Sequence, residues 1–325
     1  MRDRVLVTGG AGYVGARLCS RLLANGTPVR VLDSLLHGQN EVAESLERAG
    51  AELLRGDVRD DAARQGALDD VGAVVHLAAI VGDPACARDP ATADAVNVAG
   101  TRALIEDMRT RRVDRLIFAS TCSNYGRMAN HDVLATEESP LAPVSLYAEQ
   151  KVAIESDLLA HRWDGIRATC LRFATVYGVA PRMRFDLTVN EFTRDLWTGR
   201  ELDVYGQQFW RPYVHVDDAA AAIELLLADD GKGAGNSVYN VGSTTENYRK
   251  SDIVDVIQRH LPDGRVRYVA QVDDPRDYRV SFEKIGLQLG FSPANTVDDG
   301  VREVIAALEA GAFGDPYDPK LRNTP

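Results

Sequence analysis

The sequence lacks the features that mark membrane, secreted and nucleic-acid-binding proteins. No apolar stretch approaches the roughly 20 residues that a membrane helix needs, and the first residues, MRDRVLV, lead into a strand-like run without a signal-peptide core. Basic side chains are in the minority: 37 Lys and Arg stand against 48 Asp and Glu, for a formal net charge of -11. No long basic run offsets that charge. We therefore expect neither a membrane nor a nucleic acid as partner.

Cysteine is scarce, and no two cysteines form a CxxC pair. The four thiols are scattered along the chain at Cys19, Cys86, Cys122 and Cys170. This usage predicts no disulfide framework and favours the reduced cytoplasm. No His/Cys/Asp cluster has the spacing of metal ligands, so we expect no metal and predict structural roles for His76 and His215.

Strand-like apolar runs alternate with amphipathic segments through the first half of the chain. The runs lie at 5–7, 29–32, 52–54, 73–77, 115–119 and 168–173, and the helical segments at 13–25, 40–49, 60–69, 91–111 and 145–161. Repeated strand–helix–strand units predict an α/β fold, a Rossmann-type doubly wound parallel sheet. Runs such as AVVHLAA suit strands that are buried on both faces.

After about Thr175 this rhythm changes. An arginine-containing loop, VAPRMRF, leads to a helix at 186–198, and shorter elements follow. We predict strands near 201–205, 212–215 and 237–241 and helices near 216–228, 248–260 and 298–310. Residues 176–325 are thus predicted to form a smaller α+β substrate domain, with segments near 212–241 returning to the first domain and residues 313–325 forming a loose tail.

Three glycines, Gly9, Gly12 and Gly15, follow the first strand in the stretch TGGAGYVG. They allow a tight turn, close approach of the backbone to a pyrophosphate and close helix–strand packing, with the helix N-terminus facing the phosphate. Asp33 ends the second strand, where a carboxylate bonds a ribose 2′-hydroxyl and repels a 2′-phosphate. A P-loop is excluded because no Gly-Lys-Ser/Thr follows. Residues 1–175 are therefore predicted to bind NAD.

Tyr147 and Lys151 lie four residues apart, which puts both side chains on one face of a helix. A nearby cation favours the phenolate and lowers a tyrosine pKa from about 10. Alone, this spacing is usually a solvated helix face. After the fifth strand of a dinucleotide-binding fold, it favours Tyr147 as the general base for a sugar hydroxyl.

The fifth strand ends in FASTCSNYG, where ligands bind in open α/β sheets. Ser120, Thr121 and Ser123 offer hydroxyls there, or alternatively cap the strand in a turn. With these motifs the chain resembles an extended short-chain dehydrogenase/reductase of the nucleotide-sugar epimerase/dehydratase family, from the glycine motif to about residue 310, and is similar to UDP-sugar 4-epimerases. The resemblance implies NAD, a nucleotide-diphosphate sugar substrate, and a homodimer built on helices 91–111 and 145–161.

The resemblance also assigns site residues. Thr121, Tyr147 and Lys151 would be catalytic. The implied cofactor contacts are Gly9, Gly12, Tyr13, Val14, Asp33, Asp57, Val58, Leu77, Ala78, Ala79, Asn97, Ser120, Tyr147, Lys151 and Phe173. The implied substrate contacts are Ser123, Thr175, Arg182, Thr188, Tyr205, Arg211 and Arg276. Among them, Arg211 matches a family arginine that binds the diphosphate, although Pro212 replaces the usual aspartate.

One departure from the family bears on the reaction. Its sugar 4,6-dehydratases carry an Asp-Glu pair directly after the catalytic threonine, where this chain has Cys122 and Ser123. Dehydration is therefore disfavoured. Cys122 remains open between a packed thiol and an acid–base group in a stereochemical inversion.

The expected activity is NAD-dependent 4-epimerisation of a nucleotide sugar through a transient 4-ketosugar. A nucleotide-sugar ketoreductase, a C3 or C5 epimerase and a noncatalytic NAD-binding regulator are the alternatives. The nucleotide and the sugar stay open, with UDP-glucose and UDP-glucuronate as candidates. The uronate-specific branch resembles this chain in carrying Thr175 with Arg182 seven residues later; Arg182, with Arg184 nearby, would then bind a carboxylate, unless both arginines bind the diphosphate or lie in solvent.

Overall fold

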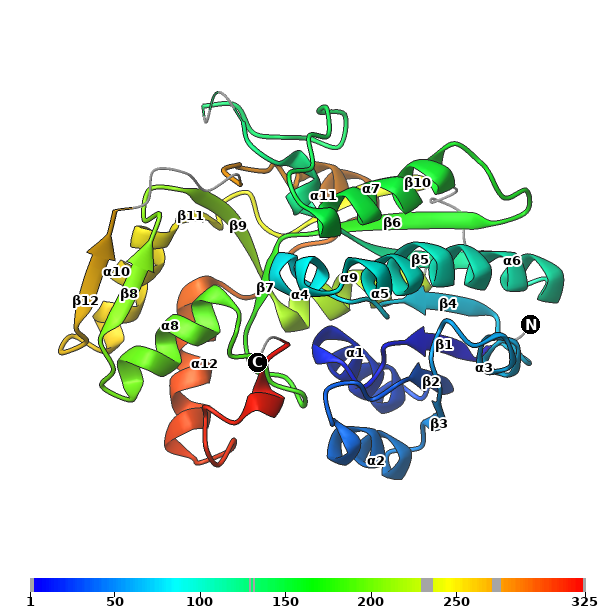
Figure 1. The fold of residues 1–325 in the computed structure, drawn as a ribbon, viewed down its shortest axis with the longest axis horizontal. Coiled ribbons are helices and arrows are strands. Elements are labelled where there is room, and N and C mark those ends of the chain that lie inside the picture. Colours follow the sequence, from blue (N-terminus) through cyan, green and yellow to red (C-terminus); the bar gives the residue numbers. More distant parts are fainter. Residues whose placement is uncertain (1–2, 129, 131, 229–235, 271–275, 324–325) are drawn as a thin grey trace. The chain divides into compact units, whose positions relative to one another are not determined.

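The fold is seen in a computed structural model that describes residues 3–128, 130, 132–228, 236–270 and 276–323. The chain forms two compact units. Unit 1 comprises the chain up to Thr121 together with Ser145–Arg172 and Ala220–Tyr239. Unit 2 comprises Cys122–Val144, Phe173–Ala219 and the chain from Asn240 onward. Figure 1 shows the elements of both units.

A seven-stranded sheet with the order β10-β6-β5-β4-β1-β2-β3 carries the first unit. The pairs β1–β2, β2–β3, β1–β4 and β4–β5 are parallel, which confirms the predicted Rossmann-type fold. Its strands are β1 (Val5–Thr8), β2 (Val29–Asp33), β3 (Glu52–Arg55), β4 (Ala73–His76), β5 (Arg115–Thr121), β6 (Arg167–Phe173) and β10 (Ser237–Val241). Strands β1, β2 and β4 are buried along their whole length, whereas β3 at the sheet edge is partly exposed.

Helices alternate with these strands along the chain. They are α1 (Tyr13–Ala24), α2 (Asn40–Arg48), α3 (Asp61–Ala67), α4 (Asp83–Arg88), α5 (Pro90–Asp94), α6 (Thr101–Arg111), α7 (Leu146–Leu159) and α9 (Val216–Ala228). The segment predicted as one helix over 91–111 is divided, because the π-helical turn η1 (Ala95–Gly100) separates α5 from α6. Such turns are frequent at functional sites, and this one carries Asn97.

The second unit is built from two small sheets and several helices. A three-stranded sheet has the order β11-β9-β7, and a two-stranded sheet pairs β12 with β8. Its elements are the 3-10 turn η2 (Cys122–Tyr125), β7 (Thr175–Tyr177), α8 (Thr188–Trp197), β8 (Leu202–Tyr205), β9 (Trp210–His215), β11 (Asn247–Arg249), α10 (Lys250–His260), β12 (Val266–Val269), α11 (Glu283–Leu289), α12 (Val297–Glu309) and η3 (Pro319–Leu321). Buried apolar residues of α8, α10 and α12 share one core cluster with β8 and β9.

The two units interleave in sequence instead of dividing at Thr175. Cys122–Val144 belongs to unit 2, where the backbone N–H of Met128 donates to Asp277 and that of Ala135 to Arg279. Ala220–Tyr239 belongs to unit 1, because β10 extends the seven-stranded sheet beside β6. The predicted return of the chain over 212–241 thus narrows to Ala220–Tyr239.

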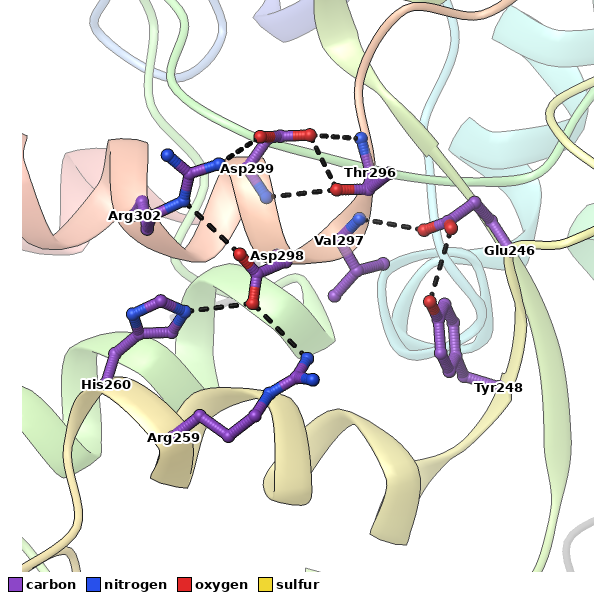
Figure 2. A network of polar contacts seen from close by, with 9 residues as sticks. All are labelled: Glu246, Tyr248, Arg259, His260, Thr296, Val297, Asp298, Asp299 and Arg302. Carbon is purple, nitrogen blue, oxygen red and sulfur yellow. Dashed lines mark hydrogen bonds and ion pairs between the residues drawn. The ribbon is translucent and has the colours of Figure 1, made fainter.

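A polar network fixes the start of α12 in unit 2 (Figure 2). Thr296 and Asp299 form a reciprocal capping box, and Glu246 accepts the N–H of Val297 at 2.8 Å. Asp298 accepts a hydrogen bond from His260 of α10 at 2.9 Å, and these contacts hold the pKa of Asp298 below its ordinary value. The network therefore ties α10 and the chain before β11 to one helix end.

The prediction of a loose tail at 313–325 is wrong for the residues described. The backbone N–H of Phe185 donates to the Leu321 carbonyl at 2.7 Å, and the Phe313 ring meets the Phe185 ring edge-on. The Tyr317 hydroxyl lies 2.9 Å from an oxygen of Asp195. Aromatic and backbone contacts thus dock this segment, although its polar composition resembles a linker.

Candidate functional site

The glycine loop of unit 1 requires glycine at two positions. Gly9 has a φ of 69°, in the left-handed region, and a Cβ there would lie 2.8 Å from the backbone nitrogen of Ala78. A Cβ on Gly15 would lie 2.2 Å from the Gly9 carbonyl oxygen. Helix α1 begins at Tyr13, directly after its N-cap Gly12, with no side-chain cap. The loop therefore fits a pyrophosphate held by backbone N–H groups.

Asp33 connects this loop to the end of β2. One carboxylate oxygen accepts the N–H of Ala11 at 2.9 Å, and the other accepts the N–H of Leu35 at 2.8 Å. The side chain is buried. Its position is thus fixed before any ligand arrives, and its charge lies beside the loop, which fits recognition of a ribose hydroxyl.

The strand end after β4 is held by a buried histidine. Thr8 lies 2.7 Å from Nδ1 of His76, and Thr101 lies 2.8 Å from Nε2. Burial lowers the pKa of His76 to about 3, so the imidazole is neutral and structural at physiological pH, as the sequence predicts. The Thr8 hydroxyl also accepts the N–H of Ala78 at 3.3 Å. This network positions the predicted cofactor contacts Leu77, Ala78 and Ala79.

The side-chain amide of Asn97 connects two segments of unit 1 by hydrogen bonds. Its Oδ1 accepts the N–H of Ile80 at 2.8 Å, and its Nδ2 donates to the Ile80 carbonyl at 3.0 Å and to Gln150 of α7 at 2.8 Å.

Asp57, another predicted cofactor contact, is hydrogen-bonded by Arg59, which donates to both of its carboxylate oxygens and lowers the pKa of the carboxyl. Val58 is buried in the core.

The predicted catalytic pair occupies the start of α7. Ser145 caps this helix, so Tyr147 lies in its first turn and Lys151 one turn later. The Lys151 ammonium donates to the Ala119 carbonyl at 2.7 Å and lies 5.8 Å from the centre of the Tyr147 ring. Burial lowers the pKa of Lys151 to about 8. Its charge is thus close enough to stabilise a phenolate on Tyr147.

A second contact between α7 and β5 lies beside the first. The Ser120 hydroxyl donates to Glu155 at 2.7 Å, and Arg172 of β6 donates to both oxygens of that carboxylate. All three side chains are buried. Together with the bond from Lys151, this contact fixes the strand residues just before Thr121, which ends β5. Ser120, predicted to contact the cofactor, uses its hydroxyl for this positioning.

In unit 2, three predicted substrate contacts surround Tyr278. The Ser123 hydroxyl lies 3.3 Å from the Tyr278 hydroxyl, and the Arg211 guanidinium lies 5.4 Å from the ring centre. Burial raises the pKa of Tyr278, while the charges of Arg211 and Arg276 oppose that rise. Tyr278 is not among the site residues predicted from the sequence, although the run RDYR places an aromatic ring between two arginines. A positive, hydroxyl-bearing group of side chains suits a diphosphate or a sugar.

The other predicted substrate contacts have local partners of their own. Thr188 begins α8 and hydrogen-bonds the buried Tyr213, and Tyr205 at the end of β8 is half exposed. Phe173 is buried at the end of β6, whereas Thr175 is partly buried at the start of β7. Arg182 is buried and donates to Asn323 and to the Arg322 carbonyl.

Comparison with known proteins identifies the family. The family model described as "NAD dependent epimerase/dehydratase family" matches residues 5–242. The chain belongs to this family. A dTDP-glucose 4,6-dehydratase of Streptomyces niveus is 32% identical over 93% of this chain and 91% of its own length. The NAD complex of the UDP-glucose 4-epimerase of Thermus thermophilus has a TM-score of 0.81 at 28% identity, covering 94% of this chain and 99% of that one.

A third similar protein is MoeE5, whose structure is solved in complex with UDP-glucuronic acid and NAD. It has a TM-score of 0.82 at 26% identity and covers 95% of this chain and 99% of its own. Membership of the NAD-dependent epimerase/dehydratase family confirms the resemblance inferred from the motifs and makes NAD the cofactor of this chain.

Within this epimerase/dehydratase, Cys122 is buried at the start of η2. Its thiol lies near enough to Tyr278 to add to the rise in the pKa of that phenol.

In the described part of the chain, no group of three or more His, Cys, Asp and Glu side chains has a metal-binding arrangement. Likewise, no helix among the described residues is sufficiently long and apolar for a bilayer crossing.

Asp33 offers the sharpest test of cofactor recognition. We expect Asp33→Ala to weaken the preference for NAD over NADP without abolishing the fold, because it removes the charge that would repel a 2′-phosphate. Dissociation constants for both cofactors, measured by titration, would show this. Asp33→Asn is the matched control, since it removes the charge and keeps an oxygen that can accept the N–H of Leu35. An unchanged preference in both variants would mean that the ribose is recognised elsewhere.

Proposed function

We propose that this protein is a nucleotide-sugar 4-epimerase that acts by transient oxidation of the sugar. The observation that supports this proposal is the arrangement at the end of β5. Thr121 there follows a strand segment fixed by Lys151 and Glu155, and the next residues are Cys122 and Ser123. The Tyr147–Lys151 pair suits alcohol oxidation, whereas the residues after Thr121 supply no carboxylate pair for expelling water.

The roles of the residues follow from their chemistry. Tyr147 takes the proton of the sugar 4-hydroxyl, Lys151 stabilises the resulting phenolate, and Thr121 hydrogen-bonds the reacting oxygen. The glycine loop and Asp33 would hold NAD, which when bound would supply hydride transfer from and to C4. Tyr147 gives its proton back when the opposite face of the 4-ketosugar has been presented. Inversion therefore requires the ketosugar to turn about its diphosphate linkage.

Unit 2 would bind the nucleotide part of the nucleotide-sugar substrate. Arg211 and Arg276 carry the positive charge that a diphosphate needs, and Ser123 and Tyr278 add hydroxyls. We also propose a cytoplasmic homodimer whose contacts come from residues 91–111, which form most of α5 with η1 and α6, and from residues 145–161, which contain α7.

A uronic acid is the second candidate for the sugar. Arg182 is a buried guanidinium in the loop after β7, and a buried cation of this kind can bind a carboxylate bidentately. MoeE5 is solved with UDP-glucuronic acid and also with UDP-glucose, so the likeness to it is compatible with both sugars. UDP-glucuronate would then interconvert with UDP-galacturonate.

One experiment tests the reaction. The purified protein is incubated in D2O with UDP-glucose, UDP-glucuronate or dTDP-glucose, and the products are identified by NMR. We expect a C4 epimer without deuterium in the sugar, no added cofactor required, and NAD released when the protein is denatured. The reason is that a cycle returning its own hydride need not release NAD.

The other reactions give different products in the same experiment. Loss of water from the sugar would establish a dehydratase, and stoichiometric consumption of added NADH a reductase. Deuterium at an inverted C3 or C5 would establish epimerisation there. Efficient turnover of UDP-glucose with none of UDP-glucuronate would exclude the uronate candidate. Arg182→Ala should otherwise impair the uronate far more than UDP-glucose.

A further inference from the structure

The loop between β7 and α8 is held in place by a segment far away in the sequence. Within unit 2, Nη1 of Arg182 donates to Oδ1 of Asn323 at 2.6 Å, and Nη2 donates to the carbonyl of Arg322 at 3.3 Å. Arg182 is only 5% exposed. Its guanidinium is therefore oriented by two acceptors from a single stretch of chain.

The same stretch contacts the loop at further points. The backbone N–H of Asn323 donates to Asp186 at 3.1 Å, and Asp186 also accepts two bonds from Arg184, at 3.0 and 2.8 Å. Burial of Asp186 opposes its ionisation, but Arg184 outweighs burial and the pKa of the carboxyl is lowered. The N–H of Phe185 donates to the Leu321 carbonyl. Residues 182, 184, 185 and 186 are thus all connected to 321–323 directly or through one partner.

An aromatic anchor fixes this stretch to α8. The guanidinium carbons of Arg194 and Arg200 lie 4.3 and 3.5 Å from the centre of the Tyr317 ring. The Tyr317 hydroxyl lies 2.7 Å from that of Thr198. Two cation–π contacts on the Tyr317 ring and a hydrogen bond from its hydroxyl therefore hold this segment in place. Phe313, against Phe185, adds an apolar contact.

We propose that residues 313–323 form a clamp that positions Arg182 for the substrate, with Asn323 as the positioning residue. The clamp fixes the position of one guanidinium within unit 2. This inference rests on the proposed function, because it takes Arg182 as a contact of the nucleotide sugar. Substrate affinity then depends on the side-chain amide of Asn323, which follows the loop by more than a hundred residues in the sequence.

Limited trypsin digestion tests the clamp without any enzymatic assay. Trypsin cleaves after arginine, and the clamped loop contains Arg182 and Arg184. We expect a variant ending at Ala312 to be cut at these two bonds, giving fragments that start at Met183 or Phe185, while the full chain resists. Equal resistance of both proteins would overturn the clamp. Because α12 ends at Glu309, the truncation leaves every helix of unit 2 outside the segment complete.

Point variants test whether the clamp serves the substrate. We expect Asn323→Ala to raise KM for UDP-glucuronate about tenfold and KM for UDP-glucose less, with kcat within about twofold, since it removes a hydrogen bond to the guanidinium that would bind the carboxylate. Asn323→Asp keeps an acceptor oxygen and should restore KM. Lys320→Ala is the matched control, because Lys320 is exposed and forms its ion pair with Asp318 of the same segment.

The outcomes separate this inference from the proposed function. An unchanged KM in Asn323→Ala, or an equal defect in Asn323→Asp, would overturn the positioning role. If Arg182→Ala leaves KM unchanged for every sugar, the assignment of Arg182 to substrate fails, and with it the proposed role of the clamp in binding. The trypsin result would then still decide whether the segment holds the loop.

Discussion

Tyr147→Phe should lower turnover at least 10²-fold, the usual scale for a general acid–base group, while leaving NAD bound. The variant removes one oxygen and keeps the ring, which lies 5.8 Å from the Lys151 ammonium. Lys151 also donates to the Ala119 carbonyl, so its position does not depend on the tyrosine hydroxyl. Steady-state kinetics and the NAD content of the purified variant measure the two parts of this expectation.

The control for this variant is a tyrosine outside the proposed chemistry. Tyr268→Phe removes the same atom from the partly exposed β12 and should leave turnover unchanged. If Tyr147→Phe kept activity near that of the wild type, another group would have to accept the proton. Cys122, buried near Tyr278, would be the first residue to replace.

The sequence predicted the elements whose physical signals are local. The glycine loop could be found because a φ of 69° at Gly9 and the crowding at Gly15 leave no room for a side chain. The strands β1 and β4 could be found because burial on both faces favours continuous apolar runs. The Tyr147–Lys151 spacing needed only the helical repeat.

The features that the sequence did not reveal depend on contacts between distant segments. Nothing in the polar run after residue 312 indicates that Tyr317 finds two guanidiniums or that Asn323 finds Arg182. The π-helical turn at Ala95–Gly100 was hidden within a helical pattern. The bond from the Ser120 hydroxyl to a glutamate 35 residues later likewise had no local signal.

That glutamate leads to the largest expected effect on stability. Glu155 and Arg172 are 1% and 3% exposed, and Arg172 donates to both carboxylate oxygens, at 3.1 and 3.2 Å. Removing one partner of a buried ion pair leaves the other charge without compensation and costs about 3–5 kcal/mol. We expect Glu155→Gln to lose a free energy of unfolding near this range, measured by urea denaturation, together with a lower Tm.

Two further variants decide whether the ion pair itself causes the loss. Glu149→Gln makes the same change at an exposed position of α7 and should be nearly neutral. The double replacement Glu155→Leu with Arg172→Met removes both charges, and buried pairs replaced by apolar side chains are often neutral or stabilising. It should therefore recover most of the stability that either single replacement loses. Additive losses would contradict this account, and the effect would then lie in packing. Because Ser120 loses its Glu155 acceptor in the double variant as well, the strand end that carries Thr121 is less firmly fixed, and turnover should stay low even when stability returns.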